Sequence, residues 1–160
     1  MKSTLILICG LSGAGKTTLA KKLTKERSAV RLCADDWVIG VLKDQKNIAE
    51  RDRLRDPVEQ LLWRLVQELL KLGNTVILEN GFWSKEERTR YLKTAKELGA
   101  RVELHYVSAL FETLWQRVEK RNSDPNELVM TKKELEDAWQ VFQPPTEVEG
   151  QSYDYFVTTT

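Results

Sequence analysis

Short apolar runs alternate along this chain with longer segments whose apolar residues recur at helical spacing. Residues 5–9, Leu-Ile-Leu-Ile-Cys, are continuously apolar, which is typical of a strand buried on both faces of a parallel sheet. The hydrophobic pattern predicts five strands, at residues 5–9, 29–33, 75–78, 101–107 and 153–157. It predicts helices at residues 17–27, 57–73, 84–98, 111–122 and 131–142.

The limits of several helices carry their own signals. Ser84 with Glu87, and Thr131 with Glu134, have the spacing of a capping box, and Gly99 is expected to end a helix. Pro57 suits the first turn of a helix. The densely and oppositely charged stretch before it, residues 43–56, is expected to be exposed and mobile.

Strands that alternate with helices at this spacing imply right-handed βαβ connections. We therefore expect an α/β three-layer sandwich, with helices covering both faces of a parallel sheet. The 160 residues fit one domain of ordinary size, so residues 1–160 are expected to form a single domain.

Composition excludes several classes of protein. No apolar run approaches the roughly 20 residues of a membrane-spanning helix, and 25 basic against 24 acidic residues provide no global attraction for nucleic acid. Cys9 and Cys33 lie in apolar stretches without metal-site spacing, which favours buried thiols in a reducing, cytoplasmic compartment.

The most specific motif is G-x-x-x-x-G-K-[ST], at the point where the first strand gives way to a helix. Glycines let backbone N–H groups turn towards an anion, the helix start adds a positive dipole, and the lysine reaches the outer phosphates. The motif predicts a nucleoside triphosphate site, with Thr17 offering its hydroxyl to Mg²⁺. The expected phosphate-binding residues are Gly10, Ser12, Gly13, Ala14, Gly15, Lys16, Thr17 and Thr18.

Carboxylates follow two of the predicted strands, and ligands of open parallel sheets bind beyond the carboxyl ends of strands. Asp35 or Asp36 is placed to orient an acceptor hydroxyl and take its proton. One of the two is also expected to cap the following helix. Glu79 is expected to hold a Mg²⁺-bound water or a substrate group; the alternative is a structural hydrogen-bond acceptor.

Arg117 and Arg121 are four residues apart, so both can point from one helix face towards one anion. The alternative is a solvated basic face that pairs with Glu112 or Glu119. Residues 122–126, which include Asp-Pro, are expected to break this helix and form a lid that excludes water.

The five tryptophans fall into two groups. Trp37 and Trp83 follow the acidic positions and could flank an acceptor by stacking, or belong to the core. Trp63, Trp115 and Trp139 lie on apolar helix faces and are expected in the core. His105, the single histidine, is assigned no chemistry.

With these residues in view, the chain resembles the small P-loop kinases related to zeta toxins, chloramphenicol phosphotransferase and the kinase domain of phage polynucleotide kinase. The resemblance rests on residues 10–18, 34–37, 76–88 and 120–123. It implies a nucleoside-kinase-like sheet of five strands in the order 2-3-1-4-5, a helical lid, ATP and Mg²⁺ as donor, and transfer of phosphate to a hydroxyl. It further implies that Asp35 is the general base and that Arg121 is the lid arginine.

Three departures from the family narrow this inference. Polynucleotide kinases have an arginine three residues beyond the aspartate, where this chain has Val38, so a nucleic-acid acceptor is disfavoured. Arg121 is the last arginine of the chain, which leaves Lys132 and Lys133 as substitutes without bidentate geometry. Glu79 stands where many relatives have aspartate.

The sequence therefore predicts an ATP- and Mg²⁺-dependent phosphotransferase that acts on a hydroxyl of a small molecule. Two alternatives stay open: a nucleotide-dependent switch or ATPase that binds a protein partner, and a 5′-hydroxyl polynucleotide kinase. Residues 131–134, Thr-Lys-Lys-Glu, lack the aspartate of the guanine-specific N-K-x-D signature, which disfavours a GTPase switch. The acceptor, the choice between ATP and GTP, and the oligomeric state are not indicated.

Overall fold

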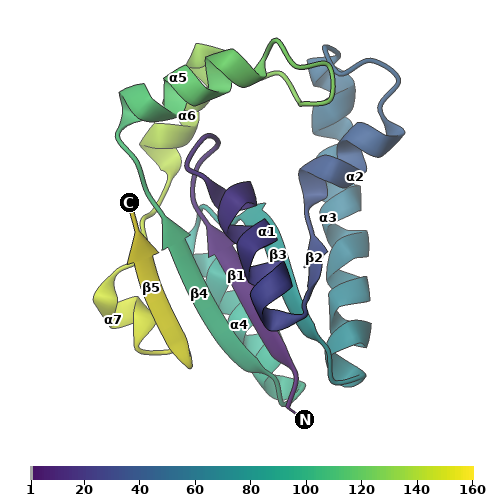
Figure 1. The fold of residues 1–160 in the computed structure, drawn as a ribbon, viewed down its shortest axis with the longest axis vertical. Coiled ribbons are helices and arrows are strands. Elements are labelled where there is room, and N and C mark those ends of the chain that lie inside the picture. Colours follow the sequence, from purple (N-terminus) through teal and green to yellow (C-terminus); the bar gives the residue numbers. More distant parts are fainter. Residues whose placement is uncertain (1) are drawn as a thin grey trace.

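The computed structural model describes residues 2–160, which form one parallel sheet with helices on both of its faces (Figure 1). The strand order is β2-β3-β1-β4-β5, as the resemblance implied. The strands are β1 (Thr4–Cys9), β2 (Val30–Leu32), β3 (Thr75–Gly81), β4 (Arg101–Val107) and β5 (Tyr155–Thr159). The helices are α1 (Lys16–Arg27), α2 (Ala34–Val41), α3 (Ile48–Lys71), α4 (Lys85–Glu97), α5 (Phe111–Arg121), α6 (Lys132–Val141) and α7 (Glu147–Gly150).

Strand β1 is the centre of the molecule, and all of its residues are buried. It pairs in parallel with β3 on one side and with β4 on the other. Because successive side chains of a strand point to opposite faces, Leu5 and Leu7 enter one hydrophobic core while Ile6 and Ile8 enter the other. The continuous apolar run is thus explained by burial on both faces.

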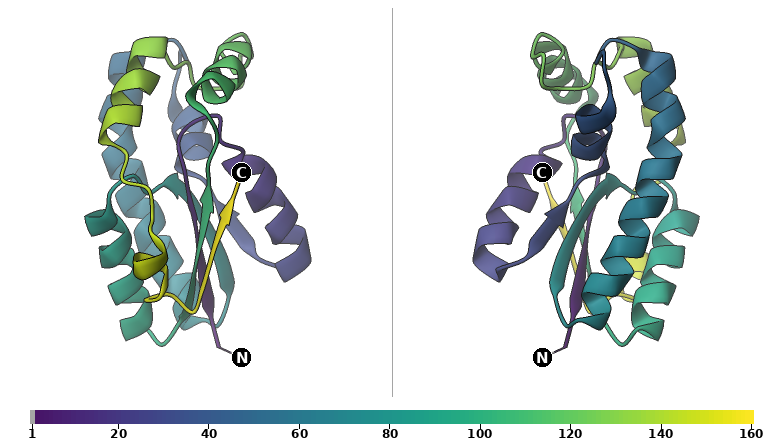
Figure 2. Two further views of the ribbon diagram at one scale, coloured as in Figure 1. Left: turned by 90° about the vertical axis from the view of Figure 1, so that its left-hand side faces the viewer. Right: turned by 90° about the vertical axis from the view of Figure 1, so that its right-hand side faces the viewer.

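The helices form the two outer layers. Helix α1 covers one face of the sheet, and α3 and α4 cover the other (Figure 2). Helices α5 and α6 lie above the carboxyl ends of the strands, where they arch over the phosphate loop between β1 and α1 (Figure 1). The predicted three-layer α/β architecture is therefore confirmed.

Helix ends agree with the capping signals. Thr131 accepts a hydrogen bond from the backbone N–H of Glu134, and the Glu134 carboxylate accepts one from the N–H of Thr131, which completes a capping box. Ser84 accepts from the N–H of Glu87 at 3.1 Å. Gly99, with φ of +80°, follows the last turn of α4 as predicted.

The prediction for residues 43–56 was wrong in part: most of these residues are exposed, but residues 48–56 form the start of a helix. Helix α3 begins at Ile48, capped by the Asn47 side chain, and Arg51 is buried. Pro57 lies inside the helix instead of in its first turn. It lies on the exposed side, where water can reach the carbonyl group that a proline leaves without its helical hydrogen bond.

Three smaller differences concern element limits and packing. Strand β3 continues to Gly81, so Glu79 lies within the strand and not after it. Strand β5 begins at Tyr155, because the preceding residues include the short helix α7, which the sequence pattern did not indicate. Trp139 is 43% exposed and contacts Phe111 edge to face, so it is not a core residue, whereas Trp63 and Trp115 pack half-buried against the cores.

The two cysteines are free and buried, as expected. Burial raises the pKa of both thiols to about 12, which keeps them protonated and unreactive. Among the described residues 2–160, no helix combines the length and apolarity that a bilayer crossing requires.

Candidate active site

The phosphate loop lies at the carboxyl end of β1, where the chain turns into α1. Gly15 is the N-cap of α1 and has φ of +104°, in the left-handed region that favours glycine. No side chain caps the helix, so its first N–H groups have no side-chain acceptor. These N–H groups and the positive end of the helix dipole provide the site that a phosphate requires.

The loop is held against α5. A Cβ on Gly13 would lie 2.7 Å from the backbone oxygen of Leu114, so only glycine allows this close approach. The Arg117 guanidinium donates to the backbone oxygen of Gly13 at 2.9 Å. Arg117 of α5 thus contacts the phosphate loop directly.

Lys16 points back over the loop, and its ammonium donates to the backbone oxygen of Leu11 at 2.9 Å. Burial lowers the pKa of Lys16, while the nearby carboxylates of Asp35 and Glu79 oppose that shift. A desolvated ammonium is stabilised by added negative charge. The loop and Lys16 together therefore fit a nucleotide polyphosphate.

Thr17 and Glu79 are hydrogen-bonded, with the Thr17 hydroxyl donating to one carboxylate oxygen. The other carboxylate oxygen accepts from Arg31 Nε at 2.8 Å. A hydroxyl beside a buried carboxylate is the protein share of a typical Mg²⁺ site, which otherwise uses phosphate oxygens and water. The residues present therefore fit Mg²⁺, although Glu79 also satisfies the alternative of a structural acceptor.

Asp35 and Asp36 lie in the first turn of α2, at the carboxyl end of β2. The expectation that one of them caps this helix was wrong: Cys33 is the N-cap and no side chain bonds there. Asp35 Oδ1 lies 2.6 Å from Arg55 Nη1 on α3, an ion pair without hydrogen-bond alignment. Asp36 accepts from Arg31 Nη1 at 3.0 Å, so α2, β2 and α3 meet at these charges.

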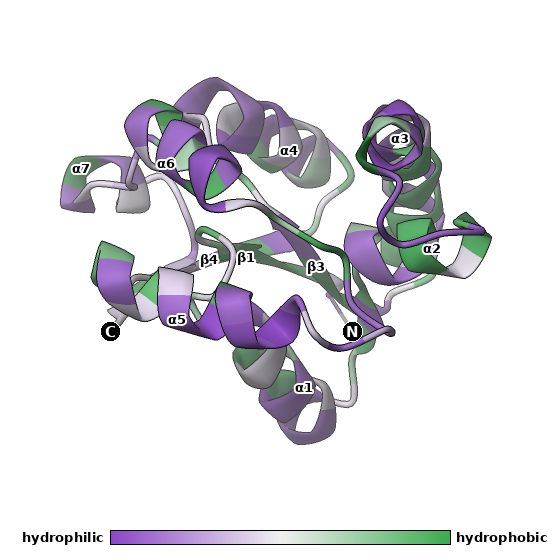
Figure 3. Ribbon diagram, turned by 90° about the horizontal axis from the view of Figure 1, so that it is seen from above, coloured by the Kyte–Doolittle hydropathy of each residue, from purple (hydrophilic) through white to green (hydrophobic). Residues whose placement is uncertain are grey.

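One cavity of about 650 Å³ is lined both by the phosphate loop and by Asp35 and Asp36 of α2. Figure 3 shows its surroundings from above: α5 and α6 lie on one side of the strand ends, and α2 and α3 on the other. The predicted residues that line it are Ser12, Gly13, Gly15, Lys16, Thr17, Thr18, Asp35, Asp36, Glu79, Trp83, Arg117 and Arg121. Gly10 and Ala14 do not line the cavity but lie buried or tightly packed within the loop.

Both arginines of α5 face the cavity. Within residues 2–160, Arg117 and Arg121 form no ion pair with Glu112 or Glu119, so the alternative of a self-paired basic face is not observed. Arg121 Nε is buried, and in the described chain it has no hydrogen-bond partner. A buried guanidinium donor without an acceptor is a favourable position for an anionic oxygen.

The tryptophans differ from one another. Trp83 is half-buried and packs against the core. It also lines the cavity, so its position is compatible with contact to an acceptor. Trp37 is 45% exposed and does not line the cavity, so it is neither a core residue nor a wall of this site. The prediction that Trp37 flanks the acceptor finds no support in its position.

Several polar residues of this cavity were not predicted from the sequence: Arg31, Arg51, Arg55, Glu59, Asn80, Glu87, Glu127 and Glu134. Arg51 and Arg55 come from the stretch that was expected to be mobile, and Glu87 and Glu134 were interpreted only as capping residues. Arg51 donates to the backbone oxygen of Val129 and to Glu134, both at 2.6 Å, and thereby joins α3 to the segment before α6 and to the first turn of α6. Arg51, Arg55 and Glu59 are four residues apart, and this spacing could have indicated that they share one helix face.

The segment between α5 and α6 lines the cavity through Glu127, Leu128, Val129 and Met130. After α5 ends at Arg121, Asn122 donates to the backbone oxygen of Met130 at 2.7 Å and accepts from its N–H at 2.9 Å. The helix break predicted for residues 122–126 is confirmed. The Asn122 side chain thus ties the start of this segment to its end at Met130. Arg51 ties the same end to α3 through Val129.

Comparisons with known proteins agree with this geometry. No curated protein matches the chain. Among solved structures, a candidate kinase from Chloroflexus aurantiacus superposes with a TM-score of 0.77 at 18% identity, covering 99% of this chain and 88% of that chain. Chaetomium thermophilum Kti12 in complex with ADP-AlF3 gives 0.74 at 17% identity, with 98% and 88% covered.

A gluconokinase from Sinorhizobium meliloti superposes with a TM-score of 0.65 at 17% identity, covering 97% of this chain and 81% of that chain. These likenesses establish the fold. A family model described as an AAA domain matches residues 5–145, which is most of the chain. With the phosphate loop, the strand order and this match, the chain belongs to the AAA domain family and has the fold of the P-loop kinases.

Proposed function

We propose that the protein transfers the γ-phosphate of ATP to a hydroxyl of a small molecule. The observation that carries this proposal is a single cavity lined at one end by the phosphate loop with Lys16 and at the other by Asp35. A nucleotide bound at the loop would place its outer phosphate towards the carboxylate. The kinases among the structural neighbours support the proposal through their shared fold.

In the proposed reaction, Asp35 orients the acceptor hydroxyl and takes its proton as the oxygen attacks the γ-phosphorus. The bond from that phosphorus to the bridging oxygen of ADP breaks, so ADP leaves with the electron pair. Lys16, Arg117 and Arg121 lie where they can stabilise charge on the phosphoryl group. Mg²⁺, when held by Thr17 and Glu79, would supply further charge neutralisation at the phosphate oxygens.

Arg55 is the positioning residue for Asp35 in this scheme. Its Nη1 lies 2.6 Å from Asp35 Oδ1 and 3.9 Å from Glu59 Oε1. Because the ion pair lacks hydrogen-bond alignment, Asp35 Oδ1 has no hydrogen-bond donor within residues 2–160. An acceptor hydroxyl would supply that missing hydrogen bond.

The test is acceptor-dependent ADP release by Asp35→Asn, measured with a panel of hydroxylated compounds. We expect turnover to fall by about 10²–10⁴-fold, the usual contribution of a general base, while calorimetry shows ATP binding retained. Asp137→Asn is the matched control, because Asp137 is exposed on α6 and, within residues 2–160, pairs only with Lys133. Unchanged turnover in Asp35→Asn would remove Asp35 from the mechanism.

Two further experiments separate the alternatives. Equal or greater thermal stabilisation by GTP than by ATP would favour a nucleotide-dependent switch. Transfer of labelled phosphate to the 5′-hydroxyl of an oligonucleotide would favour a polynucleotide kinase. We expect neither, since the chain lacks the guanine signature and has Val38 beyond Asp35.

A further inference from the structure

A second cavity, of about 590 Å³, lies between α3 and α4 beside the candidate active site. Glu59 of α3 and Glu87 of α4 line both cavities, so these carboxylates stand at the junction between them. The second cavity extends the space available to a molecule bound next to Asp35. An acceptor that enters this space passes between the two carboxylates.

The two helices present the same pair of residue types to the second cavity. Four residues after Glu59 comes Trp63, and four residues after Glu87 comes Tyr91, so each carboxylate is followed by an aromatic ring on the same helix face. The rings of Trp63 and Tyr91 contact each other with centroids 4.4 Å apart. They form a half-buried aromatic surface next to the carboxylates.

The negative charge at the junction is only partly balanced by the protein. Arg55 is the nearest cation to Glu59, at 3.9 Å, and is engaged at 2.6 Å with Asp35. Glu87 makes no ion pair with any cationic side chain of the described chain. The other charged groups of the second cavity, Asp56, Arg90, Lys93 and Glu97, are exposed at its rim.

Burial raises the pKa of both carboxyl groups. The pKa of Glu59 rises to about 7, with burial the largest cause and the charge of Glu87 among the others. Burial likewise raises the pKa of Glu87, while the positive charges of Arg90 and Arg88 oppose that rise. A positive group placed between them would remove this cost.

An independent feature of the first cavity points to a bound molecule at the same place. The side-chain nitrogen and oxygen of Asn80 are both buried, and neither makes a hydrogen bond within residues 2–160. The Tyr91 hydroxyl is close to this amide, but the two groups do not meet in hydrogen-bond geometry. Buried amides are rarely left without partners, so an acceptor with polar groups would complete the site.

We propose that the acceptor is a polyhydroxylated amine whose ammonium group binds between Glu59 and Glu87 and whose body lies on Trp63 and Tyr91. The proposal rests on the proposed function, because it assigns the acceptor of that same reaction. Carboxylate–ammonium hydrogen bonds supply the charge recognition. Asn80 accepts from or donates to a hydroxyl, and the reacting hydroxyl faces Asp35.

The test compares acceptors that share a skeleton and differ in charge: glucosamine against glucose and gluconate, and kanamycin against N-acetylated kanamycin. Phosphorylation is measured as kcat/KM with labelled ATP, and binding is measured by calorimetry in the presence of a non-hydrolysable ATP analogue. We expect the free amine to be preferred on at least one skeleton by about 10–100-fold, which corresponds to one charge-assisted hydrogen-bonded contact. The double variant Glu59→Gln/Glu87→Gln is expected to remove that preference.

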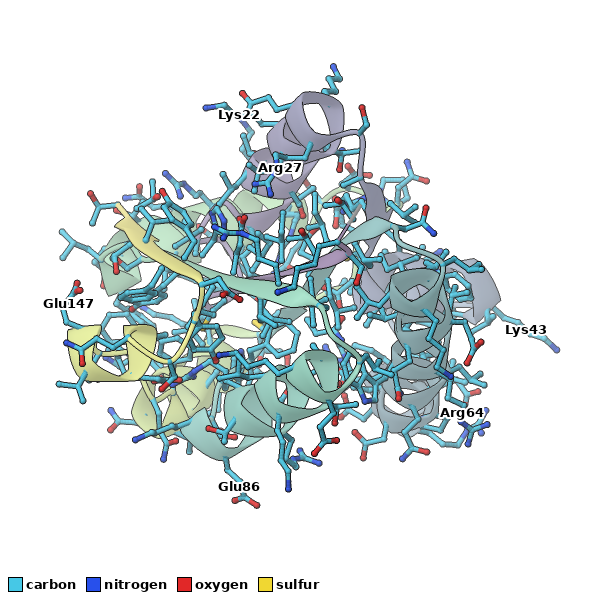
Figure 4. The ribbon with its side chains drawn as sticks, turned by 90° about the horizontal axis from the view of Figure 1, so that it is seen from below. Lys22, Arg27, Lys43, Arg64, Glu86 and Glu147 are labelled. Carbon is cyan, nitrogen blue, oxygen red and sulfur yellow. The ribbon has the colours of Figure 1, made fainter. Side chains whose placement is uncertain are left out.

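The matched control is Glu86→Gln, which makes the same change in the same first turn of α4. Glu86 is exposed and points away from the molecule in Figure 4. We expect it to keep both the amine preference and the turnover. Loss of the preference in Glu86→Gln as well would assign the effect to general charge and overturn the proposal.

The outcomes separate the two hypotheses. Phosphorylation without any amine preference, or a preference that survives the double variant, would overturn the amine site and leave the phosphotransferase intact. Amine binding that depends on the two glutamates, without transfer to any acceptor, would support the site and overturn the proposed reaction. Absence of amine binding on both skeletons would overturn the amine site.

Discussion

Replacing Gly13 by alanine tests how the phosphate loop is built. Gly13 has φ of +85°, and an added Cβ would lie 2.7 Å from the backbone oxygen of Leu114 and 3.2 Å from its Cα. The left-handed backbone costs an L-residue about 1–2 kcal/mol. Overpacking against the rigid backbone of α5 costs about 1–3 kcal/mol more. We therefore expect Gly13→Ala to lose about 2–5 kcal/mol in free energy of unfolding.

Gly99→Ala separates these two contributions. Gly99 has a similar φ of +80°, but no atom lies within 4 Å of the added Cβ. It should lose only the backbone cost of about 1–2 kcal/mol. The difference between the variants, about 1–3 kcal/mol, measures the contact of the loop with α5.

The assay is urea unfolding of both variants, followed by circular dichroism, with the slope m compared between them. For a chain of this size, the expected difference corresponds to about 2–12 °C in Tm. Nucleotide titration of the folded variants should show weaker ATP binding for Gly13→Ala only, because the loop must move to accommodate the methyl group. Equal stability of the two variants, or unchanged ATP binding by Gly13→Ala, would refute the reasoning.

Three further variants test charged groups. Arg88 is wholly buried and donates to Glu149 and to a backbone oxygen, so Arg88→Met should destabilise the protein by about 3–5 kcal/mol in urea unfolding. The pKa of Glu59 is raised in the folded state, so the wild type should lose stability as the pH rises from 4.5 to about 7. Glu59→Gln should lose less stability over the same pH range. A Glu59→Gln variant whose stability falls with pH as steeply as that of the wild type would argue against the buried charge. Burial alone would raise the pKa of Glu103, but hydrogen bonds from His105 and Arg27 lower it to about 2. The stability of the protein should therefore fall as the pH drops from 4.5 towards 2. In acid titrations, Glu103→Gln should lose less stability over this range than the wild type.

The parts of the site that follow from backbone requirements could be predicted from the sequence. One requirement, a loop whose backbone N–H groups bind phosphate, explains the buried strand, the glycines at the turn and Lys-Thr at the helix start. The structure places these residues as expected. Sheet order came from the resemblance, because alternating strands and helices alone are compatible with several orders. The cavity between Lys16 and Asp35 followed from the rule that parallel strands present their carboxyl ends at one edge.

The acceptor side could not be predicted, because its signals depend on tertiary contacts. Arg51 lies in a stretch that is polar in composition, and it is buried only because Val129 and Glu134 accept its hydrogen bonds from far along the chain. Without those partners, the charges before Pro57 indicate an exposed loop. Trp37 shows the opposite case: it lies two residues after Asp35 in sequence, yet helical geometry directs it to solvent.

Titration calorimetry of the wild type and of Lys16→Met with ATP and magnesium tests the central claim, that the loop before α1 binds a nucleotide polyphosphate. We expect the wild type to bind ATP, and Lys16→Met to bind it at least about 10-fold more weakly, because the variant loses a charge-assisted contact worth about 1.5–3 kcal/mol. The variant should unfold cooperatively, which shows that the loss lies in binding. Failure of the folded wild type to bind any purine triphosphate, or equal binding by both proteins, would contradict the account.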